Sequence, residues 1–467
     1  MTALVDESTP LKTRDTNTVS YFHRPDKGMD WYESSPRILA CSCISGFGAS
    51  FSYTAFTAWA KLLPPFFGYT GSSGDTVGAF IAASPCVLMV LPVVLDPIFI
   101  RMIGWRWTVV GNLSLSLIGA LLATLAVAAS GARTLWVYAM GTLLIGAGNG
   151  GLYISRQLVV MTTSVSARNA NFALMTIFQH AGIMCGLLLP ALSTGGMNPD
   201  VVANVQQVVS PSASVALVSL VTLVVILPLL PDSIESVPVA SAIVGNKKGS
   251  KTDLQSVASS KGVSLSDDER AARRRAIWTT LIMGFSRITI RSVVENLATV
   301  FYQVRLGWTV LQGSEILAGA YFVGLLFIFA YVHVGSKHLD DRKWSGVTIC
   351  ICLVATLLMY PYGFVTHSLL VVLFTLGLFL IIIGLSLNTA VTNSHATKYA
   401  MSDECLYTQD MIAILQIVLQ TVLARMIGPS IGYAAARQWS LNAAIAMLIG
   451  ILAVSGPLQL GMRTGKT

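Results

Sequence analysis

The sequence predicts an all-α integral membrane protein in which twelve transmembrane helices form two pseudo-symmetric bundles of six. Twelve apolar stretches approach the about 20 residues that a helix needs to cross a bilayer. One charged polar segment, 232–275, separates them into six and six. Apolar residues make up 54% of the 467-residue chain and charged residues only 11%, far below the charged share of a soluble domain.

The predicted spans follow one another with short connections. In the first half they are 37–62, 76–100, 107–129, 135–161, 169–192 and 213–231. In the second half they are 276–302, 314–334, 346–360, 368–392, 405–432 and 441–461. The chain therefore divides into a cytoplasmic tail (1–35), an N-terminal bundle (36–231), a cytoplasmic linker (232–275), a C-terminal bundle (276–462) and a short cytoplasmic tail (463–467).

The placement of basic residues predicts the orientation in the membrane. If the N-terminus is cytoplasmic, the inside segments include 232–275 with eight basic residues and 335–345 with three. The outside loops then carry only Arg133, Arg305 and Arg437. Because basic loops are retained on the cytoplasmic side, both termini are expected there. The formal charge of +8 is explained in this way, so no nucleic-acid partner is expected.

The motifs of several other protein classes are missing from the sequence. It contains no nucleotide-binding loop, no constellation of nucleophile and base, and no Cys/His spacing suited to a metal. We therefore expect neither an enzyme nor a cofactor. The predicted partners are the lipid bilayer, a small-molecule or ion substrate and, in one interpretation, protons.

Two charged loops at equivalent places in the halves indicate an internal repeat. The first follows the second span and the other follows the eighth, and an acid near several bases on such a loop could hold an inside gate shut. Ordinary cytoplasmic charge is the alternative interpretation. The candidate gating residues are Asp96, Arg101, Arg106, Asp340, Asp341 and Arg342.

The second of these loops, Gly335-Ser-Lys-His-Leu-Asp-Asp-Arg-Lys343, resembles the Gly-x-x-x-(Leu)-Asp-Arg-x-Gly-Arg loop of the major facilitator superfamily. The first copy is degenerate, because Asp96 and Arg101 stand five residues apart. The resemblance implies the major facilitator fold, which hosts transporters of many solutes.

A narrower resemblance is carried by Gly146-Ala-Gly-Asn-Gly-Gly-Leu-Tyr-Ile-Ser-Arg156, by Gln179-His-Ala-Gly182 and by Ser292-Val-Val-Glu295. This order is similar to the branch that contains lysosomal transporters of the ceroid-lipofuscinosis type and vacuolar phosphate transporters with an SPX domain. It implies an endolysosomal or vacuolar membrane and traffic of inorganic anions, with the plasma membrane as the alternative location. Because about 35 residues precede the first span, no SPX domain is expected.

Charged residues within the predicted spans are the candidate site. A charge in the hydrocarbon layer costs at least about 2.5–3.5 kcal/mol on insertion scales. Arg287, Arg291 and Glu295 follow at steps of four, so they share one helix face that must look into the bundle. Arg291 and Glu295 are expected to pair. Arg287 needs another acid, a carbonyl or an anion, or it reaches the cytoplasmic surface.

Basic groups outnumber acids in mid-membrane. Arg156 in the fourth span and Arg425 in the eleventh add to the two arginines of the seventh, against Glu295 alone. Arginine stays charged and binds phosphate or carboxylate through two parallel hydrogen bonds, so this excess favours an anionic substrate. The alternative is that some arginines only bind helix carbonyls. The predicted substrate contacts are Arg156, Arg287, Arg291, Arg425 and Gln179.

Glu295 is the predicted proton-coupling residue, since burial and a neighbouring arginine shift a carboxyl pKa in opposite directions. His180 is a second titratable candidate, although a lone histidine in a span is often a packing residue. The preferred function is secondary transport of a small inorganic or organic anion by alternating access, with proton coupling as an option. An anion (chloride) channel, a transporter of neutral sugars or drug-like solutes, and a receptor that kept the fold stay open.

Overall fold

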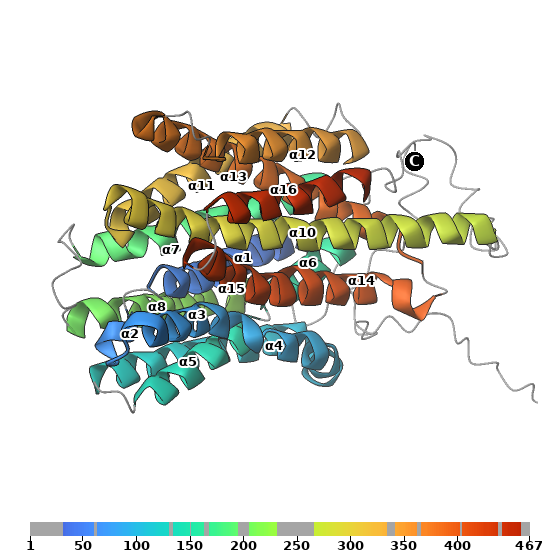
Figure 1. The fold of residues 1–467 in the computed structure, drawn as a ribbon. Coiled ribbons are helices and arrows are strands. Elements are labelled where there is room, and N and C mark those ends of the chain that lie inside the picture. The colour runs from blue at the N-terminus through green and yellow to red at the C-terminus, as the bar shows by residue number, and fades with distance from the viewer. Residues whose placement is uncertain are drawn as a thin grey trace, which may run out of the picture.

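The computed structural model is a bundle of long, roughly parallel helices (Figure 1). It describes residues 31–59, 63–129, 134–149, 151–162, 168–194, 205–230, 266–333, 341–361, 366–401, 404–437 and 441–458. Residues 1–30, 232–265 and 463–467 of the predicted tails and linker lie outside the described residues, as does Asp340.

The first half contains eight helices among the described residues. These are α1 (Trp31–Trp59), α2 (Leu63–Phe66), α3 (Gly71–Val87), α4 (Val90–Ala128), α5 (Leu135–Gly148), α6 (Gly151–Thr162), α7 (Arg168–Thr194) and α8 (Val205–Leu229). Each of the first six predicted spans coincides with one helix or with two consecutive helices.

The second half begins with α10 (Asp267–Leu306), followed by α11 (Val310–His333), α12 (Asp341–Leu358) and α13 (His367–Lys398). The eleventh predicted span is composite. It contains the 3₁₀ turn η4 (Cys405–Tyr407), α14 (Gln409–Gln416), the π-helical segment η5 (Ile417–Leu423) and α15 (Ala424–Arg437). Helix α16 (Leu441–Leu458) is the last.

Eight stretches among the described residues are long and apolar enough to cross a membrane by length and composition alone. This number is smaller than twelve for physical reasons. The second and third predicted spans form one continuous stretch, Thr76–Ala128. The fourth is divided between α5 and α6, the helix of the seventh carries Arg287, Arg291 and Glu295 within its apolar run, and the short helix of the ninth begins with charged residues.

The chain reverses direction between the second and third spans at Gly104, in the middle of α4. Its backbone angles, φ 85° and ψ 169°, lie in a region that is essentially reserved for glycine. Asn112, beyond the turn, donates a hydrogen bond from Nδ2 to Asp96 Oδ2 at 3.0 Å and so joins the two arms. The second span is also broken at Leu88 and Met89, because the ring of Pro92 is incompatible with a helical carbonyl at residue 88.

Helix α10 begins nine residues before the predicted span, within the predicted linker. Ser266 caps it by accepting a hydrogen bond from the Glu269 amide, and three acidic residues of the first turn match the positive end of the helix dipole. Arg274 donates two hydrogen bonds of 2.8 Å to Glu404, which ties this extension to the segment before α14. Helix α10 ends at Gly307 in the left-handed conformation, φ 64°.

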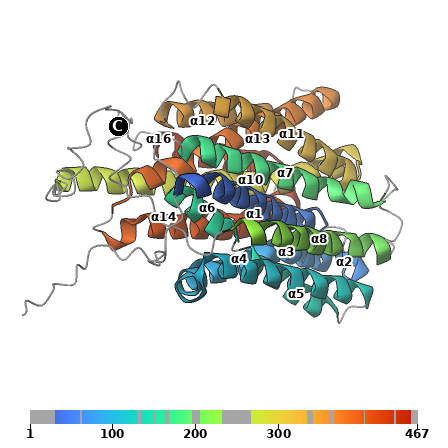
Figure 2. The same cartoon turned by 180° about the vertical axis from the view of Figure 1, so that it is seen from behind.

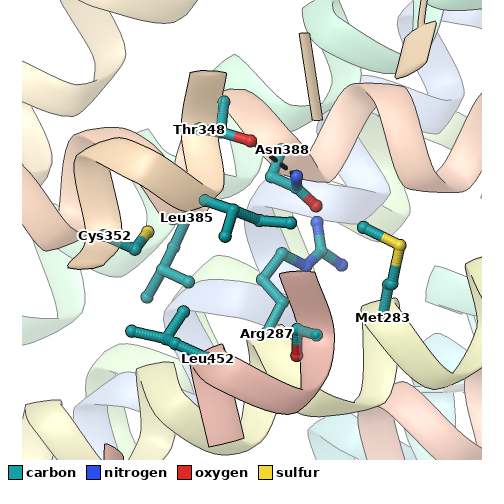
Figure 3. Close-up of a pocket in the computed structure, with 9 residues that line it drawn as sticks. Met283, Arg287, Thr348, Cys352, Leu385, Asn388 and Leu452 are labelled. Carbon is teal, nitrogen blue, oxygen red and sulfur yellow. Dashed lines mark hydrogen bonds between the residues drawn. The ribbon is translucent and has the colours of Figure 1, made fainter. Parts of the chain in front are cut away.

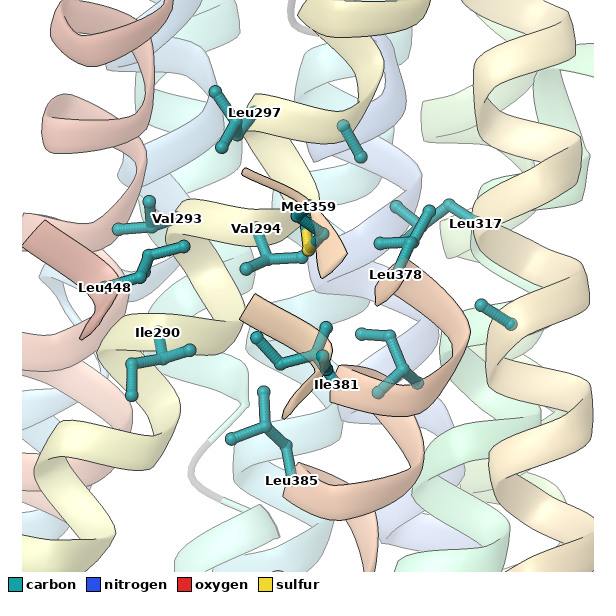
Figure 4. Close-up of a cluster of buried hydrophobic side chains, with 14 of the residues drawn as sticks. Ile290, Val293, Val294, Leu297, Leu317, Met359, Leu378, Ile381, Leu385 and Leu448 are labelled. Atoms are coloured by element: carbon teal, nitrogen blue, oxygen red, sulfur yellow. The ribbon is translucent and has the colours of Figure 1, made fainter. Parts of the chain in front are cut away.

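The two bundles contact each other through a small set of helices. In both views α7 lies between the N-terminal helices and α11 and α13 (Figures 1 and 2), and it packs against both. Helix α15 packs against α3, and α14 packs against α6. The apolar cores cross the same boundary: Ile183 and Leu187 of α7 belong to the C-terminal cluster centred on α10 and α13 (Figure 4). Ile417 and Val422 of η5 belong to the N-terminal cluster.

Gly104→Ala tests the turn between the second and third spans. Forcing a Cβ into that backbone conformation costs about 1–3 kcal/mol, so the variant is expected to melt at a lower temperature than the parent. Gly111→Ala is the matched control, because Gly111 lies in the same helix and an added Cβ there meets nothing within 4 Å. The control should be neutral or more stable. Equal melting temperatures in detergent for the two variants would contradict the assigned turn.

Candidate functional site

Helix α10 positions three charged side chains on the face that looks into the protein. Arg287, Arg291 and Glu295 are 3%, 5% and 7% exposed, so the predicted inward face is confirmed by the burial of all three. Their spacing of four places them one above another along the helix.

The predicted pair of Arg291 and Glu295 is present and has a third member. Nε of Arg291 donates to Glu295 Oε1 at 3.2 Å and to the hydroxyl of Tyr321 at 2.7 Å. The Tyr321 hydroxyl itself donates to Glu295 Oε1. The guanidinium also lies 4.7 Å from the centre of the Tyr321 ring. Tyr321 belongs to α11, so this triad joins two helices of the C-terminal bundle.

Arg287 is only weakly bonded. Its Nη2 lies 3.5 Å from Oε1 of Gln420, while Nε and Nη1 have no hydrogen-bond partner among the described residues. Gln420 reaches Arg287 from the π-helical segment η5, and its side chain fills the space left by Gly284. π-helical segments are rare and often mark functional sites, because they change the direction of the side chains they carry.

Arg156 and Arg425 bring two further charges to this centre from other helices. Arg156 of α6 is buried, and its Nε and Nη1 have no partner among the described residues. Arg425 of α15 lies 4.0 Å above the ring of Tyr53 in α1, a cation–π contact across the two bundles. The charges of Arg156, Arg291 and Arg425 all act on Arg287.

The centre therefore has an excess of positive charge and of hydrogen-bond donors. The four arginines face one carboxylate, Glu295, which is already engaged by Arg291 and Tyr321. Buried polar groups in folded proteins almost always have partners, so unpaired donors indicate a place for water or a ligand. Among the described residues, the buried side-chain nitrogens without a partner include those of Arg156, Arg287, Arg291, Gln179 and Gln420.

His180 of α7 makes a contact across the bundles. Its Nδ1 lies 2.8 Å from the Thr176 carbonyl, and its Nε2 lies 2.6 Å from the hydroxyl of Ser386 in α13. The carbonyl can only accept, so Nδ1 carries a proton, while the Ser386 hydroxyl can donate to Nε2 or accept from it. The ring also lies 5.4 Å from that of Tyr321, next to the charged triad. His180 thus uses both ring nitrogens, one within α7 and one across the bundles.

Gln179, the neighbour of His180, lies against α1. Its side chain occupies the space beside Gly46, and its Nε2 has no partner among the described residues. It is separated from His180 by one helical step, so the two side chains leave α7 in different directions. Gln179 is therefore a buried donor on the N-terminal side of the centre.

Asp341 organises the end of the protein that is predicted to face the cytoplasm. Its Oδ2 accepts hydrogen bonds from Lys398 at 2.8 Å and from His395 Nδ1 at 3.1 Å, both at the end of α13. Its Oδ1 accepts from Nδ2 of Asn169 at 2.9 Å. Asn169 belongs to α7, so this contact joins the two bundles. Beside it, Arg168 donates from Nη1 to the Thr397 carbonyl at 3.0 Å. We call this set the latch.

The carboxyl group of Asp341 is held in its charged form. Burial by itself raises its pKa, but hydrogen bonds from His395 and Lys398 and the charge of Lys398 lower the pKa by more. The net result is a pKa well below the ordinary value of about 3.9. The latch carboxylate is therefore ionised throughout the physiological range of pH.

Two of the other predicted gating residues have contacts within their own segment. Asp96 is buried and bonded to Asn112 within α4. Arg106 lies 6.0 Å from the Trp107 ring. Arg101 is exposed, and Arg342 is half-buried beside Asp341.

Sequence reasoning missed Tyr321, Gln420, Ser386 and Asn169. Each is an uncharged polar residue, and each becomes important through a contact with a residue more than 25 positions away. The π-helical segment that turns Gln420 inward has no sequence signature of its own. The described residues contain no group of three or more His, Cys, Asp or Glu side chains suited to a metal ion.

Two packed helical bundles with a buried polar centre between them define a polytopic membrane transporter. The sequence matches the family described as Major Facilitator Superfamily over residues 31–402. The chain therefore belongs to the Major Facilitator Superfamily, and the predicted fold of two six-helix bundles is confirmed. A search among curated proteins found no match.

Several solved structures share this fold. The human organic anion transporter MFSD10 (TETRAN) matches with a TM-score of 0.64 at 15% identity, over 91% of this chain and 99% of that chain. FucP, crystallised in the outward conformation, matches with a TM-score of 0.60 at 15% identity, over 91% of this chain and 99% of the FucP chain. The proton:xylose symporter XylE matches with a TM-score of 0.68 at 11% identity, over 92% of this chain and 96% of the XylE chain.

Asp341→Asn tests the latch and its dependence on pH. A carboxyl with a lower pKa in the folded than in the unfolded state stabilises the fold above the unfolded pKa, and this contribution is lost as the pH falls through the folded pKa. The variant should lose about 1.5–3 kcal/mol, the usual range for hydrogen bonds to a charged group. The loss should be the same at about pH 5 and pH 8, because both lie above the unfolded pKa.

The control for this experiment is Lys343→Gln, which changes an exposed charge two positions away. Melting temperatures of both variants should be compared with the parent at each pH. A loss of stability that appears only at about pH 8 and vanishes at about pH 5 would show that the latch titrates in the physiological range, contrary to the low pKa of Asp341.

Proposed function

We propose that this protein is a secondary transporter that moves a small anion across a membrane by alternating access between its two bundles. One observation carries the proposal: four arginines surround the centre of the protein, while Glu295 is already paired. An anion in contact with Arg156 would supply the acceptors that its Nε and Nη1 lack among the described residues, within reach of the charge of Arg425. Guanidinium groups suit this role because they bind carboxylate or phosphate through two parallel hydrogen bonds.

The helices that carry these charges come from both bundles. Arg156 belongs to the N-terminal bundle, while Arg287, Arg291 and Arg425 belong to the C-terminal bundle. A substrate held between them would therefore contact both sides of the boundary along which the bundles rock. This position supports alternating access, since relative motion of the halves would change the substrate's exposure without moving it far.

One structural neighbour supports the same substrate class. MFSD10 is described as an organic anion transporter, and its structure overlaps this chain over nearly its full length. At 15% identity this likeness establishes the fold alone, so the assignment of an anion rests on the arginines of this chain. The proposed substrates are inorganic anions such as phosphate or chloride, and small organic anions.

A neutral sugar is the second candidate, and one observation favours it. Gln179, Gln420 and Asn393 are buried amides with unpaired hydrogen-bonding atoms among the described residues, and amides suit the hydroxyl groups of a sugar. FucP and XylE are described as proton symporters of fucose and xylose. The charge excess favours the anion, because a neutral ligand would leave the arginines uncompensated.

A chloride channel with the same fold is a further alternative. Single-channel currents would distinguish it from a transporter.

We propose Glu295 as the proton-coupling residue. Its partners Arg291 and Tyr321 can hold it as a carboxylate or, through the tyrosine oxygen, as an acid. His180 contacts the same triad through Tyr321 and the opposite bundle through Ser386. His180 is thus placed to link the protonation state of the triad to the relative position of the two bundles.

We also propose the orientation and the membrane. The excess of basic residues in 232–275 and 335–345 supports termini in the cytoplasm, so the latch would close the cytoplasmic end. The motifs around Asn149, Gln179 and Glu295 support an endolysosomal or vacuolar membrane, with the plasma membrane as the alternative.

Flux measurements with reconstituted protein test the anion proposal. Phosphate, chloride, a small organic anion and a neutral sugar should be compared in proteoliposomes, and at least one anion should be transported while the sugar is not. Arg156→Lys keeps the charge but loses the planar fork. It should raise the apparent KM of the transported anion about tenfold or more, the equivalent of about 1.4 kcal/mol.

Arg273→Lys is the matched control, because Arg273 forms a half-exposed i,i+4 ion pair with Glu269 outside the centre. It should leave flux unchanged. Transport of the sugar alone, or an unchanged KM in Arg156→Lys, would contradict the assignment of an anion to the central arginines.

Glu295→Gln tests proton coupling. The amide cannot carry a proton through the transport cycle but keeps a hydrogen-bond acceptor for Tyr321, so uphill accumulation driven by a pH gradient should be lost. Exchange of labelled for unlabelled substrate across the membrane should continue. The thermal stability of the variant must be measured alongside, because the change leaves Arg291 without its carboxylate partner. Full gradient-driven uptake by Glu295→Gln would exclude Glu295 as the proton carrier.

A further inference from the structure

A small cavity lies among four helices of the C-terminal bundle. It is lined by α10, α12, α13 and α16, and its lining includes Met283, Arg287, Thr348, Asn388, Leu452 and Ser455. Figure 3 shows the Arg287 guanidinium among these side chains, next to Asn388 and Met283. The space open to the centre of a water-sized sphere is about 20 Å³, which exceeds the about 10–15 Å³ needed for one water.

Arg287 is the side chain in this lining with free hydrogen-bond donors. Its Nη2 is directed to Gln420, but Nε and Nη1 have no partner among the described residues although the residue is 3% exposed. The hydroxyls of the lining are already engaged. Thr348 donates to the Ser345 carbonyl and Ser455 donates to the Ile451 carbonyl, each at 2.8 Å.

The remaining polar group in the lining is an amide. Nδ2 of Asn388 donates to the Thr348 hydroxyl at 2.7 Å and to the Ser345 hydroxyl at 3.3 Å. No carboxylate belongs to the cavity lining, so the charge of Arg287 has no counterion there. A buried charge without a partner is costly, and an ion in the cavity would remove that cost.

We propose that this cavity binds one monatomic anion, a halide such as chloride, through Nε and Nη1 of Arg287. The charge of Arg287 selects an anion, and the small space beside it favours a monatomic ion over a carboxylate, a phosphate or a sugar. The bound halide neutralises Arg287 and holds four helices of the C-terminal bundle together. It is a fixed component of the bundle that occupies the donors of Arg287, one of the four central arginines, and leaves Arg156 and Arg425 to the transported solute.

Thermal stability of the purified protein in detergent tests this site directly. Sodium gluconate should be replaced stepwise by sodium chloride or bromide at constant ionic strength. A ligand that binds only the folded state raises the melting temperature in a saturable manner, here by roughly 2–4 °C or more. Gluconate is too large for the cavity and provides the baseline.

Three variants locate the effect. Arg287→Met removes the charge at similar length, and Leu452→Phe fills the cavity while leaving the arginine in place. Both should abolish the halide-dependent shift. If Arg287→Met fails to fold, Leu452→Phe decides. Arg156→Met changes the central site instead and should keep the shift, even where it loses transport.

Two results would overturn the proposal. A shift that is equal in gluconate and chloride would mean general salt stabilisation, and the cavity would hold water alone. A halide shift that survives in Leu452→Phe, or one that disappears in Arg156→Met and persists in Arg287→Met, would place the halide at the central arginines. The flux measurements proposed above are independent of each of these outcomes.

Discussion

The architecture depends on how the protein accommodates arginines inside a membrane. Each buried charge costs at least about 2.5–3.5 kcal/mol on insertion scales, and a sequence of 54% apolar residues offers few partners. Arg291 is compensated locally, by a carboxylate one turn along α10 and by the Tyr321 hydroxyl. Within the described part of the chain, Arg291 keeps one donor, Nη2, without a partner, whereas Arg156 and Arg287 each keep two. All three arginines are buried, but among the described residues only Arg291 forms an ion pair, so the charge and donors of Arg156 and Arg287 are the ones available to a ligand or water.

Irregular backbone brings several of the polar groups to the centre. Arg156 follows the interruption between α5 and α6, and Arg425 follows the π-helical segment η5, which also presents Gln420 to Arg287. Transporters often use interrupted helices at their binding sites, because a break changes side-chain direction and frees backbone groups. The regular helix α10 carries both the triad and Arg287. Irregular backbone thus brings groups of other helices to the charged face that a regular helix presents.

Hydropathy and charge predicted most of the fold, because crossing a bilayer requires a length and composition that can be read directly from the sequence. The i,i+4 spacing predicted the pair of Arg291 and Glu295 for the same reason, since it depends on one helix alone. The sequence did not predict the turn at Gly104, the helix break before Pro92 or the composite structure of the eleventh span. All three lie within the predicted spans or loops. Tyr321, Gln420, Ser386 and Asn169 could not be predicted, because their roles depend on the rotation of one helix against another. Asp341 was predicted as a gating residue, but its partners Asn169, His395 and Lys398 come from other helices.

The contacts between the bundles differ in strength from the contacts within them, and this difference suits a protein that must open. The hydrogen bonds from Arg168 to Thr397 and from Asn169 to Asp341 join the bundles at one end, and that between His180 and Ser386 joins them near the centre. Each contributes on the order of 0.5–3 kcal/mol net.

The triad of Arg291, Glu295 and Tyr321 lies wholly within the C-terminal bundle, so opening need not separate its charges. A change of a two-state population from 1:99 to 99:1 requires about 5.5 kcal/mol of differential binding. The summed free energy of two or three hydrogen bonds between the bundles is of this order. Separating a buried ion pair as well would add about 3–5 kcal/mol. The division of contacts therefore lets a solute bound between the bundles supply the free energy that opening requires, while the charged face of α10 stays intact.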